Sequence, residues 1–244
     1  MPHPSITAQT YPHKPAFIMG ESGEMVTYKQ LDERSNQGAQ LFRSLGLKTG
    51  DHIGMMLENN RHFTEIMWAA QRSGLVFTPV STHLKKEETA YILQNCGAKL
   101  FIGSLHLSDV AEQILSEATG VENFYMVEGI KPGFESWEEA IDGQPTTPIE
   151  DESCGVPMLY SSGTTGQPKG VFVPPADTDV HAPSPLVGSM GAAFGFSDET
   201  VYLSPAPLYH AAPLHYNMMV LYQGCLLYTS DAADDNRVVG GGGG

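Results

Sequence analysis

Short apolar segments alternate with amphipathic segments through the first half of this 244-residue chain, and this alternation limits the possible folds more than any other feature. The apolar segments are typical of strands, and the amphipathic segments repeat apolar residues at the spacing of a helix face. We expect strands at residues 51–57, 76–80, 100–103 and 124–127, separated by helices near residues 60–73, 82–97 and 108–118. About four such alternations predict an α/β fold with a mostly parallel sheet, flanking helices and right-handed crossovers.

Local signals predict where several of these helices begin. Thr27 is followed three residues later by Gln30, which is a capping-box pattern at the start of a helix. Asn60 is a suitable N-cap for the next helix, and Thr82 and Ser108 are expected to open the two that follow.

Three other stretches have telling compositions. Residues 16–19 and 25–27 flank a Glu-Ser-Gly turn and are predicted to form a hairpin. Residues 129–157 are rich in Pro, Gly and acidic residues, so we expect a surface connection with a short helical patch at 137–141. Residues 174–185 are predicted to be a loop.

A segment rich in Gly, Ser and Thr, MLYSSGTTGQPKGV from Met158 to Val171, begins as a further short strand. Glycines permit positive φ and a close approach of the main chain to a ligand. The hydroxyls, free backbone N–H groups and single mobile cation of this segment would together suit an oligophosphate ligand. The alternative interpretation is a flexible polar loop without a ligand. The residues that make up this candidate site are Ser161, Ser162, Gly163, Thr164, Thr165, Gly166 and Lys169.

The order of residues differs from the common nucleoside-triphosphate loop, G-x-x-x-x-G-K-[ST]. Pro168 precedes Lys169, and Gly170 stands where a metal-binding hydroxyl would be, so a kinase or GTPase is disfavoured. The segment instead resembles the signature [ST]-S-G-[ST]-T-G-x-P-K-G of the adenylate-forming enzymes: acyl-CoA synthetases, luciferases and peptide-synthetase adenylation domains. Every position from Ser161 to Gly170 matches that signature.

Other parts of the chain resemble the same family. The stretches VTYKQLDERSNQGAQLFRSLGLKTGDHIGMML and WAAQRSGLVFTPVSTHLKKEETAYILQNCGAKLFI resemble its first helix–strand units. Pro207, Leu208, Tyr209 and His210 match a P-[LM]-[FY]-H segment that begins a helix beside the acyl and pantetheine pockets of acyl-CoA synthetases. The resemblance implies that Tyr209 and His210 bind substrate and that His210 lies near its carboxylate. An ordinary helix-start histidine is the alternative.

The resemblance implies a two-step ligase acting on a fatty or related carboxylic acid. The acid would attack ATP to form an acyl-adenylate, which would pass to coenzyme A. Backbone amides of residues 162–166 would hold the phosphates, with Mg²⁺ on the side of Thr164. Lys169 and His210 would be the catalytic residues, and Lys169 would neutralise the departing pyrophosphate. Another adenylating enzyme, such as a peptide-synthetase domain or a luciferase-like oxygenase, and a non-catalytic nucleotide-binding remnant remain alternatives.

The composition of the chain disfavours several classes of binding partner. The net charge is −15 and the pI is about 4.8, which argues against nucleic acid and anionic membranes. Three widely spaced cysteines make neither a zinc pattern nor a disulfide framework, and the first residues lack the apolar core of a signal peptide. No apolar run approaches the ~20 residues of a membrane span. We therefore expect a cytoplasmic protein.

The chain ends before the segments with which the family binds adenine and ribose, and before the catalytic lysine of its C-terminal domain. Residues 1–224 are thus expected to be a partial N-terminal domain that is inactive as given. Residues 225–244, CLLYTSDAADDNRVVGGGGG, resemble the in-frame translation of a transposase sequencing adapter, so we set them apart as an artefactual or disordered tail. An incomplete sheet is also expected to leave the chain prone to aggregation.

Overall fold

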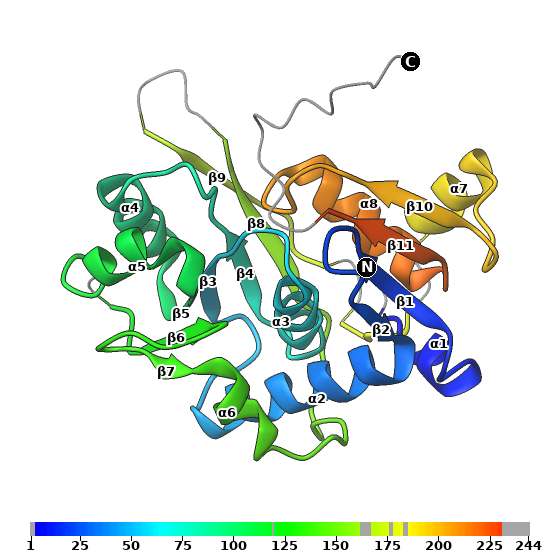
Figure 1. Ribbon diagram of the computed structural model, residues 1–244, viewed down its shortest axis with the longest axis horizontal. Coiled ribbons are helices and arrows are strands. Elements are labelled where there is room, and N and C mark those ends of the chain that lie inside the picture. The colour runs from blue at the N-terminus through cyan, green and yellow to red at the C-terminus, as the bar shows by residue number, and fades with distance from the viewer. Residues whose placement is uncertain (1–2, 119, 162–166, 176–177, 183–184, 231–244) are drawn as a thin grey trace.

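The computed structural model describes residues 3–118, 120–161, 167–175, 178–182 and 185–230, and it contains two β-sheets (Figure 1). The larger sheet, in spatial order, consists of β7 (Glu135–Ser136), β6 (Asn123–Val127), β5 (Ala98–Ser104), β3 (His52–Met56), β4 (Val76–Pro79), β8 (Val156–Ser161) and β9 (Lys169–Phe172). The smaller sheet consists of β10 (Val201–Ser204), β11 (Leu226–Thr229), β1 (Pro15–Met19) and β2 (Met25–Thr27). Neighbouring strands of the larger sheet are parallel except β8 and β9, which confirms the predicted fold class.

Helices cover both faces of the larger sheet (Figure 1). One face carries α2 (Tyr28–Ser44), α3 (Arg61–Arg72) and α6 (Trp137–Asp142), and the other carries α4 (Lys86–Cys96) and α5 (Ser108–Ile114). Alternate residues of β5 explain this division, because Leu100 and Ile102 join the first apolar cluster whereas Phe101 joins the second. A strand buried on both faces must be apolar almost throughout, as β5 is. The remaining helices are α1 (Ser5–Thr10), η1 (Leu105–Leu107), α7 (Pro185–Phe194) and α8 (Ala211–Tyr222).

Two of the four predicted helix starts are confirmed. The Thr27 side chain accepts a hydrogen bond from the backbone N–H of Gln30, and the Gln30 side chain accepts one from the backbone N–H of Thr27 at 2.8 Å. Asn60 Oδ1 accepts a hydrogen bond from the backbone N–H of Phe63 at 3.0 Å. The predicted hairpin also forms, as the antiparallel pair β1–β2.

Two helix starts differ from the prediction. Helix α4 begins at Lys86 rather than at Thr82, because the backbone N–H of Leu84 bonds to Ser81 O and closes a separate turn. Ser108 is the first residue of α5 rather than its cap, because the single 3₁₀ turn η1 leads directly into that helix. Short polar residues favour turns as readily as caps, so the pattern alone could not separate the two.

The segment at residues 129–157 is more than a surface connection. It adds β7 to the edge of the larger sheet, and Trp137 and Ile141 of α6 are fully buried. The Trp137 ring lies 5.7 Å from the ring of Phe42 and 6.2 Å from that of Tyr125. The predicted helical patch is therefore confirmed, but its side chains are part of the apolar core that α2 also contributes to, rather than of the surface.

Residues 225–230 belong to the fold, although the sequence analysis set them apart. Strand β11 lies between β10 and β1 and pairs with both in parallel. Leu227 is 1% exposed, and the Tyr28 hydroxyl donates to the carbonyl oxygen of Cys225 at 2.6 Å. Residues 225–230 thus take part in the folded structure, and the domain boundary at Gly224 stays a prediction. Residues 231–244 lie outside the described residues, and the origin of the tail stays a prediction.

Candidate functional site

The Gly/Ser/Thr segment is carried by a hairpin at the edge of the larger sheet. Strands β8 and β9 pair antiparallel, with Ser161 opposite Lys169 and Tyr160 opposite Gly170. Figure 1 shows this hairpin extending beyond β4. The predicted phosphate-binding residues Ser162, Gly163, Thr164, Thr165 and Gly166 lie between the two strands, outside the described residues. The structure therefore places Ser161 and the exposed Lys169 together at the base of the segment.

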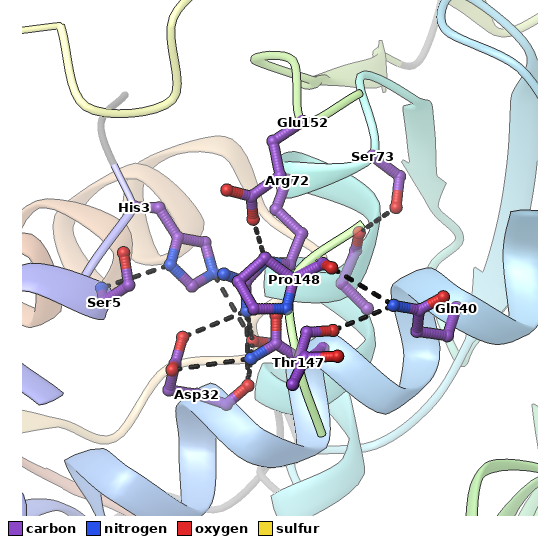
Figure 2. Close-up of polar contacts among 12 residues, drawn as sticks. His3, Ser5, Asp32, Gln40, Arg72, Ser73, Thr147, Pro148 and Glu152 are labelled. Atoms are coloured by element: carbon purple, nitrogen blue, oxygen red, sulfur yellow. Dashed lines mark hydrogen bonds and ion pairs between the residues drawn. The ribbon is translucent and has the colours of Figure 1, made fainter. Parts of the chain in front are cut away.

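Residues 152–155, which precede β8, form a strap that contacts the end of α3 and its buried Arg72. Arg72, at the end of α3, is 1% exposed, and its Nε donates to Glu152 Oε1 at 2.6 Å. Its Nη1 donates to Asp32 Oδ1 at 3.0 Å and to Ser35 Oγ at 2.9 Å (Figure 2). Two carboxylates and a hydroxyl thus compensate a charge that would otherwise be costly to bury. The consequence is that α2, α3 and the start of β8 are tied together.

Backbone contacts reinforce this strap. The N–H of Ser153 bonds to the carbonyl oxygen of Arg72 at 3.0 Å, and the N–H of Gly155 bonds to that of Gln71 at 2.6 Å. A Cβ added at Gly155 would lie 2.4 Å from the carbonyl oxygen of Leu75, so this position has no room for a side chain. Further along α2, the Gln40 amide donates to the carbonyl oxygens of residues 147 and 148 (Figure 2).

His3, near the N-terminus, packs against α3 close to Arg72. The backbone N–H of His3 bonds to Val180 O at 2.8 Å, and its ring meets Trp68 edge-to-face at 5.1 Å. Burial holds the pKa of His3 well below its usual value, and the nearby positive charge of Arg72 lowers that pKa further. His3 is therefore neutral at neutral pH.

The predicted substrate-binding segment is held by a buried amide. Asn59, which follows β3, donates from Nδ2 to Ala206 O at 3.1 Å and accepts the backbone N–H of Leu208 on Oδ1 at 2.8 Å. His210 is the N-cap residue of α8, so the segment does begin a helix. Tyr209 is buried and His210 is exposed, with ring centroids 4.6 Å apart.

His83 is a neighbour that the sequence analysis missed. It follows β4, and its ring meets that of Tyr209 edge-to-face at 6.4 Å. Asn59 was missed as well, because its partner Leu208 lies 149 residues further along the chain. The available signal was position: both residues come just after an expected strand, where the ligands of parallel sheets bind.

Asn59, His83 and Ser161 all lie at the carboxyl end of the strands of the larger sheet. Strands β3, β4 and β8 are mutually parallel, so the residues that follow them share the carboxyl end of the sheet. Asn59 follows β3, His83 follows β4, and Ser161 ends β8. The arrangement can present a phosphate-binding segment and an aromatic–imidazole group to one ligand.

A cavity of about 260 Å³ opens at the carboxyl ends of β3, β5 and β6, and Asn59 is one of the residues that line it. Glu58 and Glu128 line it with Arg61 and His106. Both oxygens of Glu58 accept hydrogen bonds, from Asn60 Nδ2 at 3.1 Å and from Ser104 Oγ at 2.5 Å. Burial raises the pKa of Glu128, and the facing Glu58 carboxylate raises that pKa further.

Neither a metal cluster nor a membrane span is found in the described part of the chain. No group of three or more His, Cys, Asp or Glu side chains there could hold a metal ion. Thr164, the residue expected beside Mg²⁺, lies outside that part. No helix among the described residues is long and apolar enough to cross a bilayer.

Comparison with known proteins gives concordant results. A family model described as AMP-binding enzyme matches residues 5–239. The crotonobetaine/carnitine–CoA ligase of Escherichia coli O139:H28 is 30% identical over an alignment of 216 residues, which covers 83% of this chain and 40% of that protein. This chain therefore spans about 40% of the length of the curated relatives it matches.

Two solved structures have the same fold. One is a protein of Rhodopseudomonas palustris assigned as a long-chain-fatty-acid CoA ligase, with a TM-score of 0.81 and 19% identity over 95% of this chain and 57% of that one. The other is a fatty acyl CoA synthetase of Mycobacterium tuberculosis, with a TM-score of 0.76 and 20% identity over 95% of this chain and 44% of that one. The resemblance inferred from residues 161–170 is thereby confirmed: the chain belongs to the AMP-binding enzyme family.

Proposed function

We propose that this chain provides the phosphate-binding part of an ATP-dependent acyl-CoA ligase. The observation that supports this most strongly is the complete match of Ser161 to Gly170 to the phosphate-loop signature, on a hairpin at the carboxyl end of a parallel sheet. The curated relative that matches is itself a CoA ligase, which favours coenzyme A over an oxygenase or a carrier-protein acceptor.

The chemistry would rely on position and charge. A carboxylate is a weak nucleophile, so holding it in line with the α-phosphate and stabilising the departing pyrophosphate are the main contributions a protein can make. Lys169 would neutralise the growing negative charge, and His210 would lie beside the substrate carboxylate. Mg²⁺, when bound, would share the charge of the phosphates on the side of Thr164.

We propose a fatty or related carboxylic acid as the substrate class. The Tyr209 ring contacts the rings of His83 and His210, and an apolar ring beside an imidazole would suit an acyl chain that ends in a carboxylate. The carnitine-related relative widens the class to small acids that carry a polar tail. A panel of acids of increasing chain length, tested in a full-length ligase that contains these residues, would order the candidates.

Binding of MgATP to the chain, measured by isothermal titration calorimetry, tests the first step. We expect weak binding that is lost in Lys169→Ala and kept in Lys29→Ala, a control that removes an exposed lysine from α2. Tripolyphosphate should compete with ATP, because the chain is expected to hold the nucleotide through its phosphates. Equal binding by the wild type and Lys169→Ala would contradict the proposal.

A further inference from the structure

Tyr160 directly precedes Ser161, the first residue that matches the phosphate-loop signature, and its side chain contacts helix α4. Its hydroxyl donates a hydrogen bond to Asn95 Oδ1, at 2.6 Å, near the end of α4. The ring also packs against the apolar cluster of α4, α5 and the larger sheet. Tyr160 thus joins the hairpin β8–β9 to a helix that the hydrogen bonds of the sheet do not connect to it.

Gly170 makes room for this ring. It lies directly opposite Tyr160 in the hairpin, and a Cβ added there would lie 2.9 Å from Tyr160 Cζ and 3.1 Å from its hydroxyl oxygen. The same Cβ would lie 2.3 Å from Met158 Cε, but that atom ends a flexible side chain. Gly170 does not have positive φ, so the requirement is for space rather than for an unusual backbone conformation.

Beyond its base the hairpin is attached through side chains: Leu159 packs against the first apolar cluster, and Met158 packs beside Tyr160 against the second. In the described part of the chain, β8 pairs with β4 at Val156 and Pro157, and the later residues of β8 pair with β9 alone. The ring of Phe172 also contacts that of His52, at 6.3 Å. Among these attachments the Tyr160 hydroxyl makes a directed hydrogen bond to a helix, at the last-but-one residue of β8, so it can fix the position of the hairpin more closely than apolar contacts alone.

We propose that Tyr160 is a positioning residue, which fixes the phosphate-loop hairpin against α4 through Asn95, and that Gly170 is required because the Tyr160 ring occupies its side-chain space. The effect on ATP rests on the proposed function, whereas the anchor itself does not. Burial raises the pKa of the Tyr160 hydroxyl, and the nearby Cys96 and Tyr91 raise that pKa further, so the hydroxyl remains a hydrogen-bond donor at physiological pH.

Amide hydrogen exchange of residues 158–161 and 169–172 tests the anchor in the 244-residue chain. Tyr160→Phe and Asn95→Ala are each expected to speed exchange there several-fold, with the rest of the larger sheet unchanged. Asn95→Asp should restore slow exchange, because a carboxylate also accepts the hydroxyl proton. Tyr11→Phe, which removes an exposed hydroxyl, is the matched control. Wild-type exchange in Tyr160→Phe and Asn95→Ala would overturn the proposal.

Gly170→Ala supplies an independent test by double-mutant cycle. Alone, it should speed exchange of the hairpin by displacing the Tyr160 ring. In a Tyr160→Ala background it should add little, because the space is then empty. Additive effects of the two substitutions would show that Gly170 acts through another contact and would overturn its assignment.

Titration with MgATP separates the anchor from the proposed function. Tyr160→Phe and Asn95→Ala are expected to weaken binding several-fold; Asn95→Asp is judged by exchange alone, because its charge would also repel the phosphates. If the wild type binds no ATP while the exchange results hold, the proposed function fails and the anchor stands. If ATP binds equally well to the wild type and to variants whose hairpin exchanges faster, the positioning role fails.

Discussion

Lys169 occupies the first position of β9, exposed and opposite Ser161, so its ammonium can reach a ligand held by the residues between the two strands. The motif put both residues in one candidate site, but it did not predict strand β9 or the pairing of Ser161 with Lys169. Asn59 and His83 could not be found in the same way, because their partners in the segment at residues 206–209 are brought near only by the fold. Long-range contacts of this kind leave no local pattern in a sequence.

Removing the Lys169 charge should slow adenylate formation. In a full-length ligase that contains this segment, Lys169→Ala is expected to lower the rate of pyrophosphate release about 10- to 100-fold, because a hydrogen bond to a charged group contributes roughly 1.5–3 kcal/mol. Lys29→Ala serves as the control for loss of a surface charge. Unchanged pyrophosphate release in Lys169→Ala would exclude the role.

His3 should make stability fall in mild acid. Its pKa is lowered in the folded state, so the unfolded chain binds more protons between that lowered value and the ordinary value of about 6.5. Its contribution to the free energy of unfolding is therefore complete above about pH 6.5 and decreases as the pH falls below it. His3→Gln should flatten this dependence in urea unfolding measured between pH 5 and 8. His13→Gln, with the same change of charge nearby in sequence, should not.

Glu128 should act in the opposite direction. Its raised pKa means that the folded chain binds more protons than the unfolded chain above the ordinary value of about 4.3, so its contribution to stability decreases as the pH rises through the raised value. Glu128→Gln removes the charge that faces Glu58 and should raise the melting temperature at neutral pH. Glu122→Gln is the matched control. A lower melting temperature for Glu128→Gln alone would contradict the repulsion.

At the scale of elements, helix ends were more predictable than packing. The capping residues Thr27 and Asn60 act on groups three residues away, so the sequence contains the whole interaction. Helix α6 and strand β11 are short, and their partners are distant in sequence. Trp137 is buried because Phe42 and Tyr125 cover it, and β11 forms because two strands flank it. Burial by tertiary partners outweighs composition there: the sequence predicted the helical patch that became α6 but not its burial, and it did not predict β11.

The strap around Arg72 should matter more than an average ion pair. Arg72→Leu would leave Asp32 and Glu152 facing each other without their common cation, and the expected loss is about 3 kcal/mol in the free energy of unfolding. Arg34→Leu, which removes a pair with the exposed Asp142, should cost under about 1 kcal/mol. Urea denaturation of both variants measures the difference. Equal costs would mean that the burial of Arg72 adds nothing.

At the scale of the whole molecule, the described structure has exposed apolar strand edges. Val201 and Leu203 of β10 are 63% and 64% exposed, and β10 is the outer strand of its sheet. Such an edge is a template for pairing with another chain. The net charge of −15 opposes association through repulsion that salt screens. The balance between these effects decides whether the chain stays monomeric.

We therefore expect association that increases with salt. Light scattering of the 244-residue chain should grow with protein concentration and between low salt and about 0.5 M, where the screening length is only a few ångströms. Val201→Lys together with Leu203→Lys should reduce it, because charged residues protect an edge strand. The double variant Lys29→Glu and Glu33→Lys leaves the net charge unchanged and is the control. A wild-type monomer that melts cooperatively at high salt would contradict this expectation.

The position of β11 also has a consequence for synthesis on the ribosome. Phe17 of β1 pairs with Leu227 of β11, so the pairing partner of β1 is synthesised 210 residues later. At roughly 5–20 residues per second, that delay is about 10–40 s, during which the nascent hairpin β1–β2 displays an unpaired edge. The N-terminal segment thus depends on a strand that is synthesised much later, and a chaperone that shields extended apolar segments during translation should raise the yield of the protein.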